Sequence, residues 1–177
     1  DINVGVTAGI ETTMVAPIWL QKAWDMDKII TISQHSKTVY ENTTYDATNN
    51  STGEKFVAKC NTPIEIVHYP VRNVESEDLN IDFETDFNFL AIAQGAPRKA
   101  LEETVSLTHG EGFGLPLFEA AYSGLPVIAP EWSGHLDFLC MPVKDKKGKT
   151  RVKPMFASVE YSISNVHPGV VWDGVIQ

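Results

Sequence analysis

Strand-like and helix-like segments alternate along the first part of the chain, and this alternation constrains the fold more than any other feature. The predicted elements are a strand at residues 2–7, a helix from Pro17, a strand at residues 28–32 and a helix at residues 37–45. Pro17 suits a first helical turn, and Ser33 or Ser36 can cap the second helix. Strand–helix–strand–helix order predicts an α/β fold with a parallel sheet.

A loop, a strand and a linker are predicted to complete the first half. Residues 46–53 are polar and form the loop, residues 64–68 the strand, and the acidic residues 72–84 an interdomain linker. Two N-glycosylation sequons of the form Asn-x-Ser/Thr occur, at Asn42 and Asn50. Because the chain starts without a basic, apolar leader, no signal peptide and no glycosylation are expected.

A second alternating unit is predicted after the linker. Its elements are strands at residues 87–93 and 105–107, a glycine-rich loop at 109–114, a helix at 115–123, a strand at 126–129, a short helix at 135–139, a basic hairpin or loop at 144–153 and an edge strand at 159–163. Only 11 residues separate the first two strands. A parallel crossover needs about a dozen or more, so a missing segment is expected near residues 100–105.

Charge and cysteine content exclude several classes of function. The 177 residues carry a formal net charge of −9, which disfavours nonspecific binding to nucleic acid or to an anionic membrane. Two cysteines that lie far apart predict neither a disulfide framework nor a zinc site, and favour a reducing, cytoplasmic compartment. The histidines lack metal-ligand spacing, and no apolar run is long enough for a transmembrane segment.

The most informative motif pairs two glutamates around a glycine loop. Seven residues separate Glu111 from Glu119, and Gly112-Phe113-Gly114 lies between them at the start of a predicted helix. Glycines let a backbone approach a ligand, and a helix N-terminus favours an anion. Carboxylates can bind sugar hydroxyls, as acidic residues do with ribose in dinucleotide sites. The motif therefore predicts binding of a nucleotide joined through phosphates to a polyol.

The stretch from Glu111 to Glu119, followed by Gly124-Leu-Pro-Val-Ile128, resembles the signature of family 4 retaining glycosyltransferases. The resemblance implies the GT-B fold, in which two Rossmann-like domains carry parallel sheets, here represented only in part. It divides the chain into an acceptor-side domain at residues 1–70, a linker at 71–85 and a nucleotide-sugar-binding domain at 86–177. The implied reaction transfers a sugar from a nucleotide-diphosphate donor to an unknown glycan, lipid or protein acceptor with retention of configuration, without metal or cofactor.

The same resemblance assigns roles to individual residues. Arg98 and Lys99 match the basic pair that holds the donor diphosphate, and Glu111 matches the residue at the donor sugar. The remaining donor-binding residues are Gly112, Phe113, Gly114, Leu115 and Glu119, of which Glu119 contacts the ribose. Such cationic and carboxylate groups suit a leaving group on which negative charge develops.

Departures from the family pattern leave two rival functions open. The first-domain histidine of the family has no counterpart, so Glu11 and His109 are the candidates for the acceptor side. Asp137 stands near a later acidic position of the family but in a different local pattern. One rival is a non-catalytic nucleotide-sugar-binding or assembly protein. The other is a GT-B epimerase or phosphorylase.

Overall fold

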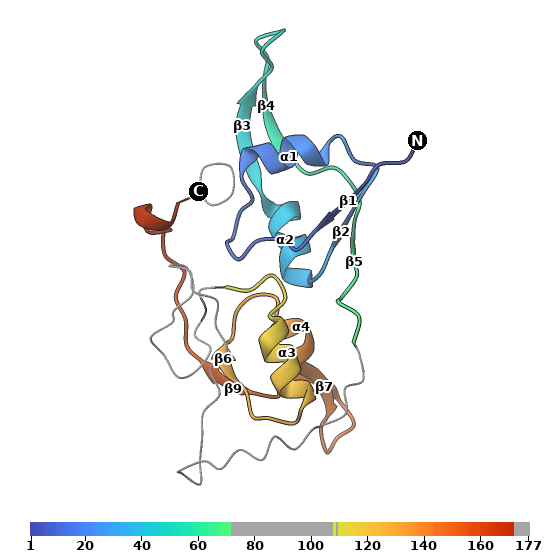
Figure 1. The fold of residues 1–177 in the computed structure, drawn as a ribbon, viewed down its shortest axis with the longest axis vertical. Coiled ribbons are helices and arrows are strands. Elements are labelled where there is room, and N and C mark those ends of the chain that lie inside the picture. Colours follow the sequence, from blue (N-terminus) through green and yellow to red (C-terminus); the bar gives the residue numbers. More distant parts are fainter. Residues whose placement is uncertain (72–107, 109, 172–177) are drawn as a thin grey trace, which may run out of the picture.

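The computed structural model describes residues 1–71, 108 and 110–171. Four small sheets occur among these residues, two of them parallel and two of them hairpins. The parallel sheets lie in different parts of the chain, one in the upper half of Figure 1 and one in the lower half. Parallel strands connected through helices confirm the predicted α/β class.

The first unit is built on a three-stranded parallel sheet. Its strands are β1 (Val4–Thr7), β2 (Lys28–Thr31) and β5 (Ile64–Ile66), in the order β1-β2-β5. The connecting helices are α1 (Pro17–Ala23) and α2 (Gln34–Asn42). Leu20 of α1, Tyr40 of α2 and Ile29 of β2 belong to one buried cluster, so both helices pack on the same face of the sheet.

The second helix begins and ends earlier than predicted. Ser33 has extended backbone and its side chain accepts a hydrogen bond from the Ser36 N–H, so the helix starts at Gln34. At the other end, the buried Thr43 hydroxyl donates to the Val39 carbonyl over 2.7 Å. This hydroxyl also accepts from the Val15 N–H, which ties the end of α2 to the segment before α1.

The loop predicted at residues 46–53 is the tip of a hairpin: residues 46–48 belong to a strand, and residues 49–53 lie in the turn. Strands β3 (Thr44–Thr48) and β4 (Lys55–Lys59) pair antiparallel, and only the turn between them is irregular. The prediction was wrong because the polar residues alternate with Tyr45 and Ala47, which lie on the less exposed side of the strand. The Tyr45 hydroxyl donates to the Val15 carbonyl over 2.7 Å. Such tertiary contacts offset the low strand propensity of Asp46.

Among the described residues, the second unit has a smaller buried cluster than the first. It contains α3 (Leu115–Tyr122), β6 (Ile128–Pro130), α4 (Leu136–Leu139) and β9 (Ala157–Val159), with β6 and β9 parallel. Between α4 and β9 lies a hairpin of β7 (Cys140–Lys144) and β8 (Thr150–Pro154). The predicted strand at 159–163 is thus displaced toward the N-terminus. In the part of this unit that the structure describes, Leu117, Val127, Ala129 and Leu139 form the buried cluster.

The chain returns to the first unit after β9. Val166 packs against the core of the first unit, and a short 3-10 helix, η1 (Pro168–Val170), follows it. The strands predicted at 87–93 and 105–107, the linker and the undersized crossover all lie outside the described residues. Among the residues described, no helix has the length and apolar character needed to cross a membrane.

Candidate functional site

Loops from both units meet between the two parallel sheets, at a place we call the junction (Figure 1). The first unit contributes the segments that follow β1, β2 and β5, which are residues 8–11, 32–36 and 67–69. The second unit contributes the segment that follows β6, residues 131–137, and the glycine loop, residues 110–114. The carboxyl ends of strands in both sheets therefore point toward this place. That edge is where open α/β sheets bind ligands.

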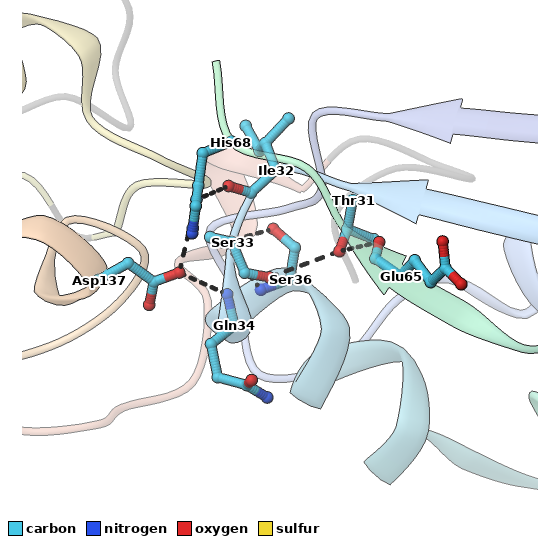
Figure 2. A network of polar contacts seen from close by, with 8 residues as sticks. All are labelled: Thr31, Ile32, Ser33, Gln34, Ser36, Glu65, His68 and Asp137. Carbon is cyan, nitrogen blue, oxygen red and sulfur yellow. Dashed lines mark hydrogen bonds and ion pairs between the residues drawn. The ribbon is translucent and has the colours of Figure 1, made fainter. Parts of the chain in front are cut away.

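Asp137 connects the two units directly. Its carboxylate oxygen Oδ2 accepts a hydrogen bond from the backbone N–H of Gln34 over 2.7 Å, as Figure 2 shows. Gln34 is the first residue of α2, where N–H groups lack partners within the helix and the helix dipole favours a negative charge. Asp137 therefore serves as an acceptor for a helix of the other unit.

His68 approaches the same carboxylate. Its Nδ1 lies 2.9 Å from the carbonyl oxygen of Ile32 and 3.9 Å from Oδ2 of Asp137. The ring also lies against Phe113, with centroids 5.8 Å apart. His68 thus touches the loop after β2, the first turn of α4 and the glycine loop, and so contributes to holding three segments together.

The glycines of the junction are required by backbone packing. A Cβ atom on Gly110 would overlap the Glu11 carbonyl, and one on Gly112 would overlap the Ala8 carbonyl. On Gly134 it would overlap the Gly112 carbonyl within the second unit. For Gly110 and Gly112 the sequence interpretation was close approach to a ligand, whereas in this structure the neighbour is protein backbone. A side chain at any of the three would push the loops apart.

The glycine loop leads into α3 through Gly114. Gly114 is the N-cap of the helix and has φ +90°, a conformation that residues with a side chain rarely adopt. Phe113 is only 5% exposed and packs among the rings of Tyr69, Phe118 and Phe138. Any ligand at this loop would therefore meet the backbone of residue 113, because the side chain anchors the loop to the core.

The two glutamates differ in their surroundings. Glu111 is half-buried; its N–H donates to Oγ of Ser133 over 2.9 Å and its carbonyl accepts from the Gly134 N–H over 2.8 Å. Glu119 has an exposed side chain in the middle of α3. That both carboxylates line one cleft stays a prediction.

His135 is buried completely beneath the glycine loop. Its Nε2 donates to the Pro130 carbonyl over 2.7 Å, while Nδ1 has no partner among the described residues. Burial lowers the pKa of His135, and the bond to Pro130 and the charge of Glu111 oppose that shift in part. The ring is therefore neutral near pH 7, with a buried acceptor nitrogen beside the loop.

His35 is the counterpart on the first unit. It packs edge-on against Trp132 with centroids 4.9 Å apart, and its Nε2 is buried without a partner among the described residues. Burial lowers the pKa of His35, and the charges of Asp137 and Glu11 act in the opposite direction. The sequence predicts no functional role for His35 or His135, because no local signal indicates that a histidine shortly after a strand will be buried.

Of the other predicted site residues, some lie at the junction and some lie outside the described residues. Glu11 is half-buried and contacts the glycine loop at Gly110, while Leu115, the first residue of α3, is 42% exposed. Arg98, Lys99 and His109 lie outside the described residues. The junction thus brings Glu11 and Glu111 to adjoining loops, and their roles on the two sides of one site stay a prediction.

Comparison with known proteins adds no relative. The scan against protein-family models and the searches of curated proteins and of solved structures found no match to this chain.

Proposed function

We propose that this protein transfers a sugar from a nucleotide-diphosphate sugar to an acceptor, with retention of configuration, at a junction of the GT-B type. The observation that supports the proposal most is the meeting of strand carboxyl ends from two parallel sheets at one junction, with Glu111 beside it. Ligands of open α/β sheets bind at that edge, and loops from two units can enclose both donor and acceptor.

The donor is assigned to the second unit. In this proposal Glu111 contacts the donor sugar, Glu119 the ribose, and the amides of residues 112–114 the sugar and phosphate. Arg98 and Lys99 hold the diphosphate and stabilise it as charge develops on the leaving group. Glu11 and His109 line the acceptor side; the backbone of Glu11 lies against the glycine loop at Gly110.

The test is turnover of nucleotide-sugar donors by the whole chain, measured as nucleoside diphosphate release with several bases and sugars. Replacing Arg98 and Lys99 together by alanine should lower kcat by roughly 100-fold or more, because the pair acts on charge that grows in the transition state. The matched control replaces Lys55 and Lys59, two exposed cations of the β3–β4 hairpin, and should leave kcat unchanged. Normal turnover in the folded Arg98/Lys99 variant would refute the assignment.

A second candidate function is non-catalytic binding of a nucleotide sugar. It is favoured by the close backbone packing of Gly110 on Glu11 and of Gly112 on Ala8, which joins the two units where the reaction would take place. Calorimetric titration with nucleoside diphosphates separates the two candidates. Binding without donor turnover or isomerisation supports the second, whereas turnover supports the first.

A further inference from the structure

The β7–β8 hairpin concentrates positive charge on an acidic chain. Residues 140–154 hold six of the chain's 14 lysines and arginines and only one acid. The six are Lys144, Lys146, Lys147, Lys149, Arg151 and Lys153. The chain-wide net charge of −9 therefore conceals a local basic face, which the sequence prediction against anionic surfaces did not consider.

These cations are free to meet a partner. All but the turn of the hairpin is a two-stranded ribbon, and every residue of β8 is exposed. Within the described part of the chain, none of the six forms an ion pair. The single acid, Asp145, turns its Oδ1 toward the backbone N–H groups of Lys147 and Lys149, at 2.8 and 3.0 Å.

Apolar side chains are exposed beside the cations. Met141 is 53% exposed, Val152 70% and Met155 60%. In the strand register Met141 is paired with Lys153, and Val143 with Arg151, so apolar and basic side chains alternate across one face of the ribbon. Val152, paired with Pro142, occupies the opposite face. Both faces thus offer apolar atoms next to positive charge.

Protection of strand edges does not account for this pattern. Lysine and proline on exposed edges hinder edge-to-edge aggregation, and the β3–β4 hairpin has lysines at two such positions, Lys55 and Lys59. Lys146 and Lys147, however, lie in the turn of the β7–β8 hairpin, where no strand edge needs protection. Positive charge at the tip of a ribbon points to a partner outside the chain.

We propose that the β7–β8 hairpin docks the protein on an anionic lipid surface. Lysines attract acidic headgroups, while exposed methionine and valine side chains can enter the boundary between headgroups and acyl chains. Nucleic acid fits less well, because the hairpin has a single arginine and no aromatic residue for base stacking. The hairpin projects from the second unit away from β1 and β2 (Figure 1), so docking leaves the first unit clear of the surface.

The experiment is sedimentation of the full chain with vesicles of phosphatidylcholine alone or with phosphatidylserine added. Binding should require phosphatidylserine and should fall as salt is raised, because screening weakens the attraction. The double variant Lys147→Gln/Lys149→Gln should bind the anionic vesicles roughly 30-fold more weakly, because each lysine near such a surface strengthens binding about fivefold.

Matched variants make the result decisive. Lys55→Gln/Lys59→Gln removes the same charge from the other hairpin and should bind as the wild type does. Met141→Ser/Val152→Ser keeps the charge and should weaken the binding that persists at high salt. Equal binding to both kinds of vesicle, or equal loss in both lysine variants, would overturn the proposal. So would displacement from vesicles by short RNA or DNA, since the partner would then be nucleic acid.

Discussion

The two sides of the junction are built in different ways. On the first unit, Ser33 and Ser36 are completely buried, yet the two hydroxyls bond to each other at 3.1 Å and cap α2. On the second unit, Ser133 has φ +83°, and no other non-glycine residue among those described has a positive φ. Each side also has a buried histidine nitrogen without a described partner, in His35 on the first and in His135 on the second. Strained backbone and unpaired buried groups gather at functional sites more often than elsewhere. The backbone strain at Ser133 therefore favours the second side as the place of the proposed reaction.

Gly134→Ala, on the second side of the junction, should have the largest effect on stability. The new Cβ would overlap the Gly112 carbonyl, a backbone atom that cannot rotate away, so the free energy of unfolding should fall by about 3 kcal/mol. Chemical denaturation measures the change. The control, Gly53→Ala, has a positive φ but meets nothing within 4 Å, and should cost only about 1 kcal/mol. If both substitutions lowered the free energy of unfolding equally, the loops around Gly134 and Gly112 would separate easily and the expectation would be wrong.

The buried histidines make stability depend on pH. The pKa of His135 is lowered in the folded protein, so the unfolded chain binds the proton more readily, and stability is lost as pH falls below about 6.5. His135→Gln should reduce the dependence of the free energy of unfolding on pH by up to about 1.4 kcal/mol per pH unit. Urea titrations from pH 7 to pH 5 measure it.

His35→Gln tests the pH dependence of stability on the first unit's side of the junction. His35 is less buried than His135, so its replacement should flatten the slope by a smaller amount. A larger effect at His35 would reverse the comparison between the two sides.

Asp137→Ala tests the hydrogen bond that crosses the junction. It removes a charged acceptor from the Gln34 N–H at the start of α2 and should cost about 1.5 kcal/mol. Thermal and denaturant melts measure the loss. Asp25→Ala is the control, because the exposed pair of Asp25 with Lys22 at 3.7 Å contributes little. If Asp25→Ala cost as much, the contact across the junction would have no special importance.

The smallest effect is expected at the cap itself. Ser33→Ala removes the acceptor of the Ser36 N–H within the first unit and should cost about 1 kcal/mol in the same melts. Ser51→Ala in the exposed turn of the β3–β4 hairpin should change stability by less than about 0.5 kcal/mol. A Ser33 cost above that of Asp137→Ala would place the stabilisation within the first unit instead of across the junction.

Local sequence patterns were sufficient for much of the secondary structure. The helix from Pro17, the strand at 28–32 and the helix after Gly114 were predicted close to their observed bounds. The basic segment at 144–153, predicted as a hairpin or a loop, is part of a hairpin that begins at Cys140. Each depends on signals within a few residues, such as a proline in the first turn, β-branched runs or a glycine cap. The β3–β4 hairpin was missed because the segment around the end of β3 is polar and the strand is stabilised by contacts with distant residues such as Val15.

The sequence by itself determined the α/β class, the glycine loop before α3 and the pair of glutamates around it. Only the tertiary structure decided what surrounds them: that Gly112 packs on Ala8, that Asp137 accepts from Gln34, and that His135 is buried. The reason is sequence separation, since Gln34 and Asp137 are 103 residues apart and no local pattern encodes their meeting. Local propensities specify elements, whereas burial and the pairing of buried polar groups depend on which elements pack together.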